Sequence, residues 1–186
     1  AIANLIVLNR WKRTSTTLLL KDAGRPRIHR MRTIHIIEAE LQFVSKFVYV
    51  IQMMGNAEKL GLISDEQYGG RNGRQAQSAV LNKICYGDIS RQTRVNWACM
   101  DDDAKACYDR ILLMAAYLSM RNFGIPEPAA TCAIFGLATM EMKIRISFGN
   151  SDVQYGGKWW EDLPHGIGQG NGYGPAIWAA ISSPLL

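Results

Sequence analysis

Between positions 34 and 60 the apolar residues recur at every third or fourth place, which is the spacing of one face of an α-helix. They are Ile37, Leu41, Val44, Phe47, Val48, Ile51 and Met54. The pattern predicts a helix from about Ile34 to Leu60, and Gly61 is suited to a left-handed cap at its end. Polar side chains such as Glu38 and Gln42 interrupt the stretch, which favours a core helix over a membrane span.

Three more helices are predicted further along the chain. The first runs from Gln75 to about Thr93, and four of its side chains are expected in the core: Ala79, Val80, Ile84 and Ile89. A short apolar strand over residues 95–100 follows. Helices are then expected at 111–122 and 127–140, with Gly124 and Pro126 stopping the first of them.

Strands are predicted near both ends of the chain. Residues 14–20 suit a short strand before the turn formers Gly24, Arg25 and Pro26. Residues 143–148 alternate with a period of two, and 149–152 are turn formers that lead to a second strand at 153–155. Since helices mix with a β-hairpin, and another helix starts at Pro175, the predicted class is α+β.

Charge is concentrated at the start of a chain that is otherwise close to neutral. Of the 186 residues, the first 32 hold eight Lys or Arg and one acid, a net charge of +7, whereas the remainder is −2. A concentrated basic arm favours a polyanionic partner, because neutralised phosphates release counterions. A solvated basic tail without a partner is the alternative.

The four cysteines show no metal-binding or disulfide spacing. Cys85, Cys99, Cys107 and Cys132 form no C-x-x-C pair, and the three histidines lie far apart. Reduced thiols are therefore expected, which points to an intracellular location, nuclear or cytoplasmic, and no membrane partner is expected.

Three consecutive carboxylates, Asp101 to Asp103, end the predicted strand at 95–100. Such carboxylates suit a hard divalent cation, because Mg²⁺ prefers oxygen ligands and often shares them with phosphates. A solvated acidic turn before a helix is the alternative. An EF-hand is excluded, because Lys105 and Ala106 occupy its third ligand position and its glycine.

Glycine occupies every second position from Gly166 to Gly174. Glycines let the backbone approach a ligand closely, and Gln169 is the residue among them with both a donor and an acceptor. No frame gives G-x-G-x-x-G, and no G-x-x-x-x-G-K-[ST] exists, so neither dinucleotide nor P-loop binding is indicated. A flexible surface loop is the alternative.

Four segments, in this order, resemble the motifs of reverse transcriptases. Lys21 with Arg32-Thr33-Ile34 resembles "K … R-P-I" of the fingers strands, with Thr33 for proline. Gln67-Tyr68-Gly69-Gly70-Arg71-Asn72-Gly73-Arg74 resembles "Q-F/Y-G-F-x-x-G-R/S". The stretch from Asp103 to Arg110 resembles "D-x-x-x-A-F-D-R", with Cys107 for alanine. The stretch from Gly166 to Pro175 resembles "G-x-P-Q-G-x-x-x-S-P", with Gly168 for proline and Gly174 for serine.

This resemblance covers the chain from about residue 20 to its end. It implies one partial domain, fingers-like over about 1–95 and palm-like over about 96–186, with helices packed on a small antiparallel sheet. It also implies an RNA-directed DNA polymerase of a retroelement, a nucleotidyltransferase. Its partners would be an RNA template, a DNA primer and dNTPs, and its cofactor two Mg²⁺ (or Mn²⁺) ions that assist attack on the α-phosphate.

The resemblance assigns roles to individual residues. Asp103, five residues before Tyr108, would be the catalytic metal ligand, and Tyr108 would be the gate that excludes a ribose 2′-hydroxyl. Asp101 becomes a ligand if the strand slips by two residues, since both face the same side of a strand. The remaining assignments are triphosphate binding for Lys21 and Arg32, nucleotide and template-base positioning for Gln169 and Gly170, and template contact for Gln67, Gly69, Arg71 and Arg74.

Two other interpretations remain open. A viral RNA-dependent RNA polymerase palm has a D-x₄₋₅-D motif, which Asp103 and Asp109 meet, but it places a serine and an asparagine where this chain has its Gln-Gly loop. A non-catalytic relic that only binds nucleic acid is the other. The family's aromatic-x-Asp-Asp motif is expected beyond Leu186, so we expect the 186-residue chain to be a fragment that is inactive alone.

Overall fold

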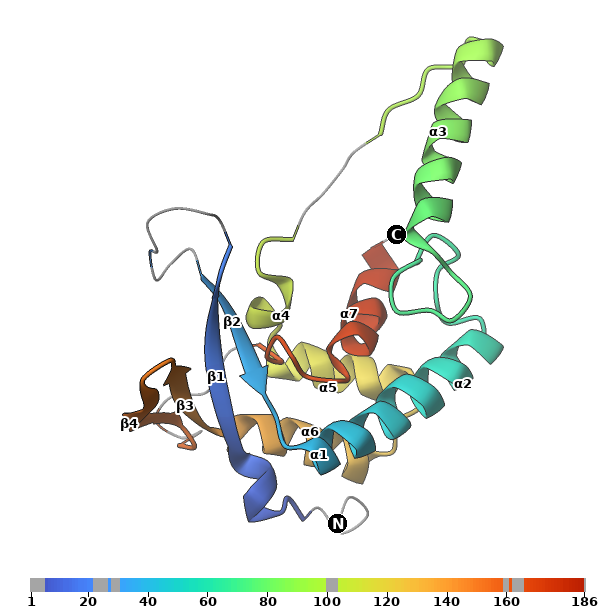
Figure 1. The fold of residues 1–186 in the computed structure, drawn as a ribbon. Coiled ribbons are helices and arrows are strands. Elements are labelled where there is room, and N and C mark those ends of the chain that lie inside the picture. Colours follow the sequence, from blue (N-terminus) through green and yellow to red (C-terminus); the bar gives the residue numbers. More distant parts are fainter. Residues whose placement is uncertain are drawn as a thin grey trace.

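The computed structural model describes residues 6–21, 27, 31–99, 104–158, 161 and 166–185. These form an α+β fold, as predicted (Figure 1). The first part contains the 3₁₀ turn η2 (Asn9–Lys12), β1 (Arg13–Leu20), β2 (Met31–Ile36), and one long helical segment made of α1 (Ala39–Ser45), the π-helical η4 (Lys46–Met53) and α2 (Met54–Lys59). The second part contains α3 (Ala76–Thr93), α4 (Cys107–Arg110), α5 (Leu113–Asn122), α6 (Glu127–Ala138), β3 (Glu141–Ile146), β4 (Gly149–Gly156), α7 (Gly174–Ser182) and η5 (Ser183–Leu185).

The four strands form one sheet in the order β2-β1-β3-β4. β1 pairs antiparallel with β2 and parallel with β3, and β3 pairs antiparallel with β4. The expectation of a purely antiparallel sheet was therefore wrong. The central pair joins strands that come from either side of the predicted boundary near residue 95, so the sheet is shared between the fingers-like and palm-like parts.

One face of this sheet is buried and the other is exposed. Thr14, Thr16 and Met142 point into the buried face, where Met142 belongs to the same apolar core as the helices. Arg13 and Lys143, at the alternate positions of the same strands, are exposed. Because successive side chains of a strand point to opposite faces, the alternation fixes which residues belong to which face.

The core lies between the long helical segment and α5, α6 and α7. Met53, Met120 and Ile177 are among the most deeply buried side chains. The hydroxyl of Tyr49 donates to the carbonyl of Ala129 at 3.0 Å, and the rings of Tyr49 and Tyr173 lie with their centroids 5.1 Å apart. These contacts attach η4 both to α6 and to the start of α7.

The long helical segment begins later than predicted. The expected start at Ile34 was wrong, because residues 31–36 form β2 and pair with β1 along its whole length. The helix starts after Glu38, whose side chain accepts a hydrogen bond from the amide of Leu41 at 3.0 Å and so caps it. Its end was predicted correctly, since Gly61 follows with a positive φ of 65°.

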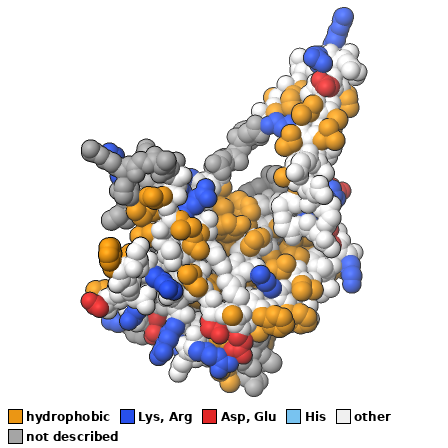
Figure 2. Space-filling view, viewed as in Figure 1, with side chains coloured by type: hydrophobic (Ala, Val, Ile, Leu, Met, Phe, Trp, Pro, Cys, Tyr) orange, Lys and Arg blue, Asp and Glu red, His pale blue; other side chains and the backbone are white. Residues whose placement is uncertain are grey.

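Helix α3 projects away from the rest of the molecule (Figure 1). Its bounds match the prediction, but its predicted burial was wrong: none of its residues is buried, and Val80, Ile84 and Ile89 are exposed. Figure 2 shows hydrophobic side chains along this projecting helix. The strand expected at 95–100 was also wrong over its described part, because residues 95–99 form no regular element.

The remaining elements agree with the predictions from the sequence. Helices α5 and α6 and the β3–β4 hairpin lie where the pattern placed them. Within the described ranges, no helix combines the length and the apolar character that crossing a bilayer requires.

Candidate functional site

The glycine-rich loop before α7 is fixed between β2 and α4. The amide of Gly166 donates to the carbonyl of Ile111 at 3.0 Å, and the amide of Ile167 donates to that of Tyr108 at 2.8 Å. On the other side, the amide of His35 donates to the carbonyl of Gln169 at 2.7 Å. The loop is therefore an anchored part of the fold, which argues against the alternative of a flexible surface loop.

Glycine is required in this loop because the neighbouring backbone comes very close. A Cβ at Gly166, where φ is 82°, would stand 2.5 Å from the carbonyl oxygen of Tyr108. A Cβ at Gly170, where φ is 108°, would overlap the carbonyl oxygen of His35. Both positions combine a left-handed backbone with a lack of space, so only glycine fits without strain.

Gln42, on α1, holds the same loop from the side. Its Nε2 donates to the carbonyl of Gly170, and its Oε1 accepts from the amide of Gly172, each at 2.6 Å. Both ends of one side-chain amide are thus used by the loop backbone. This link was missed at the sequence level, although Gln42 and Lys46 stand four residues apart as polar interruptions of the apolar helix stripe.

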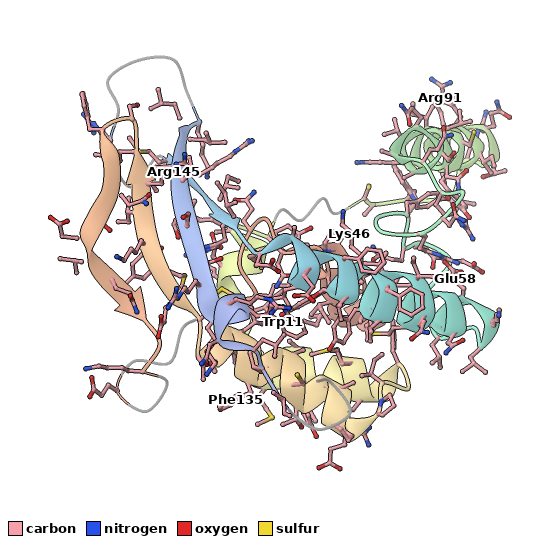
Figure 3. The ribbon with its side chains drawn as sticks, turned by 60° about the horizontal axis from the view of Figure 1, so that its bottom comes forward. Trp11, Lys46, Glu58, Arg91, Phe135 and Arg145 are labelled. Atoms are coloured by element: carbon pink, nitrogen blue, oxygen red, sulfur yellow. The ribbon has the colours of Figure 1, made fainter. Side chains whose placement is uncertain are left out.

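The loop, α1 and α4 together line a groove of about 420 Å³. Tyr108 forms one wall, the backbone of Gly168 to Gly174 forms the floor, and Gln42 and Lys46 form the other wall. The exposed Lys46 lies on the long helical segment (Figure 3). The groove thus offers an aromatic ring, exposed peptide groups and one cation, in a volume of the size typical of small-ligand sites.

Tyr108 is directed into this groove by a sharp turn. Ala106 has a φ of 51°, an uncommon left-handed conformation for a residue with a side chain, and it precedes α4 directly. The Tyr108 ring then lies against the backbone of Gly174, where a Cβ would come within 3.4 Å of the ring. Partial burial raises the pKa of the Tyr108 hydroxyl, so this group is a neutral donor and acceptor near pH 7.

Behind the loop, a chain of three polar side chains crosses the buried face of the sheet. The hydroxyl of Tyr155 donates to Oγ1 of Thr16 at 2.5 Å, and Thr16 Oγ1 lies 3.1 Å from Nδ1 of His35. Burial lowers the pKa of His35, and the carboxylate of Asp109 acts in the opposite direction. With the net shift downward, His35 is neutral near pH 7, and a donor at Thr16 places the ring proton on Nε2.

The segment predicted to contact a template packs against α7. Gly70 lies beside Pro175, since a Cβ there would stand 3.3 Å from the Pro175 carbonyl oxygen. Gln67 is buried: its Oε1 accepts from the hydroxyl of Ser182, and its Nε2 donates to the carbonyl of Gly69, both at 3.0 Å. The two predicted motif loops, 67–74 and 166–175, therefore meet at the start of α7.

Within that segment the two arginines differ in how free they are. The Arg71 side chain is only 7% exposed and forms two 2.6 Å hydrogen bonds to the carboxylate of Glu58. It also donates to the carbonyls of Ser64 and Gln67 at 2.7 and 3.2 Å. Arg74 lies at the surface, pairs with Asp65 at 3.1 Å and stacks over Tyr68, so Arg74 is the better placed of the two for an external phosphate.

The cations predicted for the triphosphate are not brought beside the groove. Arg32 pairs with Leu19 and shares the exposed face of the sheet, whereas His35, at an odd position of the same strand, faces the glycine loop. Lys21 is exposed just beyond the end of β1. Both therefore lie toward the tip of the β1–β2 hairpin.

The predicted metal ligands Asp101 and Asp103 lie outside the described residues. In the part of the chain that the structure describes, no group of three His, Cys, Asp or Glu side chains is arranged to hold a metal ion. The described carboxylate nearest in sequence is that of Asp109, on α4. A magnesium site at Asp103 and Asp101 thus stays a prediction from the sequence.

No known family model matches this chain, and no curated protein matches it either. The arguments for function therefore rest on the four motifs and on the geometry described above.

Proposed function

We propose that this chain is part of an RNA-directed DNA polymerase, and that the groove between Tyr108 and the glycine loop receives the incoming deoxynucleotide. The observation that carries the proposal is the contact between Tyr108 and the Gly168–Gly174 backbone across one 420 Å³ groove. Two segments that resemble separate motifs of reverse transcriptases thus form opposite walls of a single site.

In this proposal each wall has a distinct role. The Tyr108 ring packs against the sugar and leaves no room for a 2′-hydroxyl, while Gln169 and Gly170 position the base pair. The exposed Lys46 at the groove is suited to a phosphate, because a lysine ammonium binds phosphate as a compact charge. Arg74, at the outer end of the adjoining 67–74 loop, would contact the template backbone.

Metal ions enter the proposal through the sequence alone. A bound Mg²⁺ at Asp103 and Asp101 would stabilise charge on the reacting phosphate oxygens. Lys21 and Arg32 would neutralise the pyrophosphate only if the β1–β2 hairpin bends toward the groove, because Arg32 belongs to the opposite face of the sheet.

A binding measurement on the 186-residue chain tests the groove directly. dGTP and GTP differ only at the 2′ position, so their dissociation constants, measured by calorimetry with Mg²⁺ present, compare the sugars alone. We expect dGTP to bind about tenfold more tightly, a discrimination typical of one added group in a close-fitting pocket. Tyr108→Ala should reduce this preference to about twofold or less, because the ring that would meet the hydroxyl is gone.

Tyr86→Ala is the matched control, since Tyr86 is an exposed tyrosine on α3, away from the groove. It should leave both dissociation constants unchanged. A preference for GTP would favour the RNA-dependent RNA polymerase alternative. Equal binding of both nucleotides, unaffected by Tyr108→Ala, would contradict the assignment of the groove.

A further inference from the structure

The exposed face of the sheet carries a row of cations that the groove does not use. They are Arg32 on β2 and Lys143 and Arg145 on β3, and we refer to them as the outer basic surface. All three side chains are exposed. Figure 3 shows Arg145 on the sheet, on the opposite side of the molecule from the end of α3.

The strand register places these cations on the same face. Ser15 pairs with both Ile36 and Lys143, and Thr17 pairs with both Ile34 and Arg145. Leu19 pairs with Arg32. Because directly paired residues point to the same side of a sheet, this face is the one opposite to Thr16 and His35. The outer basic surface is thus separated from the nucleotide groove by the thickness of the sheet.

The cations here have no partners among the residues that the structure describes. Neither Lys143, Arg145 nor Arg32 forms an ion pair or a side-chain hydrogen bond within the described ranges. The acids of this face lie toward its other end, where Glu141 pairs with Arg13 in register and Glu38 caps α1. Asp152 lies on β4, within the irregular stretch of its pairing with β3.

The same face also has a hollow and an exposed aromatic ring. A hollow of about 590 Å³ runs along it and is lined by Ser15, Lys143, Asn150 and Gln154, which offer hydrogen-bonding groups beside the charge. Phe148, in the β3–β4 turn next to Arg145, is 98% exposed, so its ring packs against nothing in the chain. An open aromatic ring beside a line of cations and amides matches the needs of unpaired bases and their phosphates.

We propose that the outer basic surface binds single-stranded nucleic acid, with Lys143 and Arg145 on the phosphates and Phe148 stacking on a base. Stacking on an exposed ring requires a base that is free of a duplex, which is why a single strand fits better than a double helix. The proposal does not depend on the groove, since the two sites lie on opposite faces of the sheet and share no residue.

Fluorescence anisotropy with a labelled, unstructured 12-nucleotide RNA tests this surface on the 186-residue chain. Lys143→Gln with Arg145→Gln should weaken binding about tenfold at moderate salt, and should reduce the slope of log K against log salt by about two, one for each lost phosphate contact. Phe148→Ser should weaken RNA binding at least about fivefold, yet leave the affinity for heparin unchanged, because heparin has no bases to stack.

The control keeps the same change of charge away from the sheet. Lys59→Gln with Arg91→Gln removes two exposed cations, of which Arg91 lies on α3 (Figure 3). It should alter RNA binding less than about twofold. The proposal is overturned if this control loses as much affinity as the Lys143 and Arg145 variant, or if Phe148→Ser has no effect on RNA. Preferential binding of anionic lipid vesicles through Lys143 and Arg145 would also overturn it.

Discussion

Gln42 donates a 2.6 Å hydrogen bond to the carbonyl of Gly170, across 128 positions of sequence. The same side chain accepts from the amide of Gly172 at 2.6 Å, so one amide group fixes two points of the loop. Since that loop is the floor of the groove, the shape of the groove depends on a residue of the first long helix.

Removing this amide should loosen the loop. Gln42→Leu keeps the size of the side chain but leaves the Gly170 carbonyl and the Gly172 amide without partners, which should lower the free energy of unfolding by about 2 kcal/mol. Urea titration measures this loss. Gln52→Leu, at an exposed glutamine on the same helical segment, is the control and should cost less than about 0.5 kcal/mol. Equal losses in the two variants would show that the Gln42 contacts contribute nothing.

Adding a methyl group at Gly170 should be worse than adding one at an open glycine. Gly170→Ala places a Cβ on the carbonyl oxygen of His35, so a loss of about 3 kcal/mol is expected from overlap and backbone strain combined. Gly73 also has a positive φ, of 73°, but nothing lies within 4 Å of its added Cβ. Gly73→Ala should therefore cost only about 1 kcal/mol, and the difference between the two midpoints in urea isolates the overlap.

His35 should make the protein less stable as the pH falls below its ordinary pKa of 6.5. Burial, the larger influence, lowers its pKa in the folded state, so the unfolded chain binds a proton first. Stability is then unaffected above pH 6.5 and decreases as the pH drops from 6.5 toward the lower folded pKa, because ν for the unfolded state exceeds that of the folded state.

The measurement is the free energy of unfolding at a series of pH values for the wild type and for His35→Asn. The difference between the two curves removes contributions from the other histidines. It should change with pH below 6.5 and be flat above it. A difference that stays constant across the whole range would contradict the lowered pKa.

Arg71 is expected to stabilise the fold, whereas Arg74 is expected to have little effect on it. Arg71→Gln breaks the paired hydrogen bonds to Glu58 and two bonds to carbonyls, so the free energy of unfolding should fall by about 2 kcal/mol. Arg74→Gln removes a surface pair with the exposed Asp65 and should cost less than about 1 kcal/mol. Thermal unfolding of both variants checks the order, and a larger loss for Arg74→Gln would reverse the assignment.

The same contact links stability to acid. Hydrogen bonding from Arg71 lowers the pKa of Glu58 below its usual value of 4.5. This contribution is present above pH 4.5 and is lost as the pH falls through the lower folded value, so the cost of Arg71→Gln should shrink in that acidic range.

Local pattern was sufficient to predict most of the secondary structure. The period-two alternation at 143–148 and the turn after it define the β3–β4 hairpin, and the ends of α3 and of the long helical segment follow from spacing and Gly61. The same reasoning failed at Ile34, because the apolar residues of β2 and of the helix follow one another with only Ile37 and Glu38 between them. Pairing with β1, a tertiary effect, decided the outcome there.

The burial expected of α3 failed for a related reason. Val80, Ile84 and Ile89 are apolar, but Leu81 and Tyr86 are also exposed, so apolar residues surround the helix and do not mark one face. Spacing alone could not say whether a partner surface exists for them. In the described structure the helix projects and buries none of its residues.

For the site, the sequence indicated the segments but not the contacts between them. Tyr108 and the glycine loop were singled out by motif, and the structure adds that they face each other. The roles of His35 and Gln42 could not be predicted, because each acts through a contact with residues more than a hundred positions away. Arg71 was expected to face a template, and only the positions of Glu58, Ser64 and Gln67 show that its donors are already used.

The parallel pairing of β1 with β3 has a consequence for how the protein is made. A ribosome releases β1 and β2 more than a hundred residues before β3, so the early hairpin presents one bare edge of β1 to its surroundings during most of synthesis. Unpaired edges recruit other strands. Until residue 146 emerges, we expect the nascent chain to depend on chaperones that cover this edge, and its yield to fall with any delay in translation between the two strands.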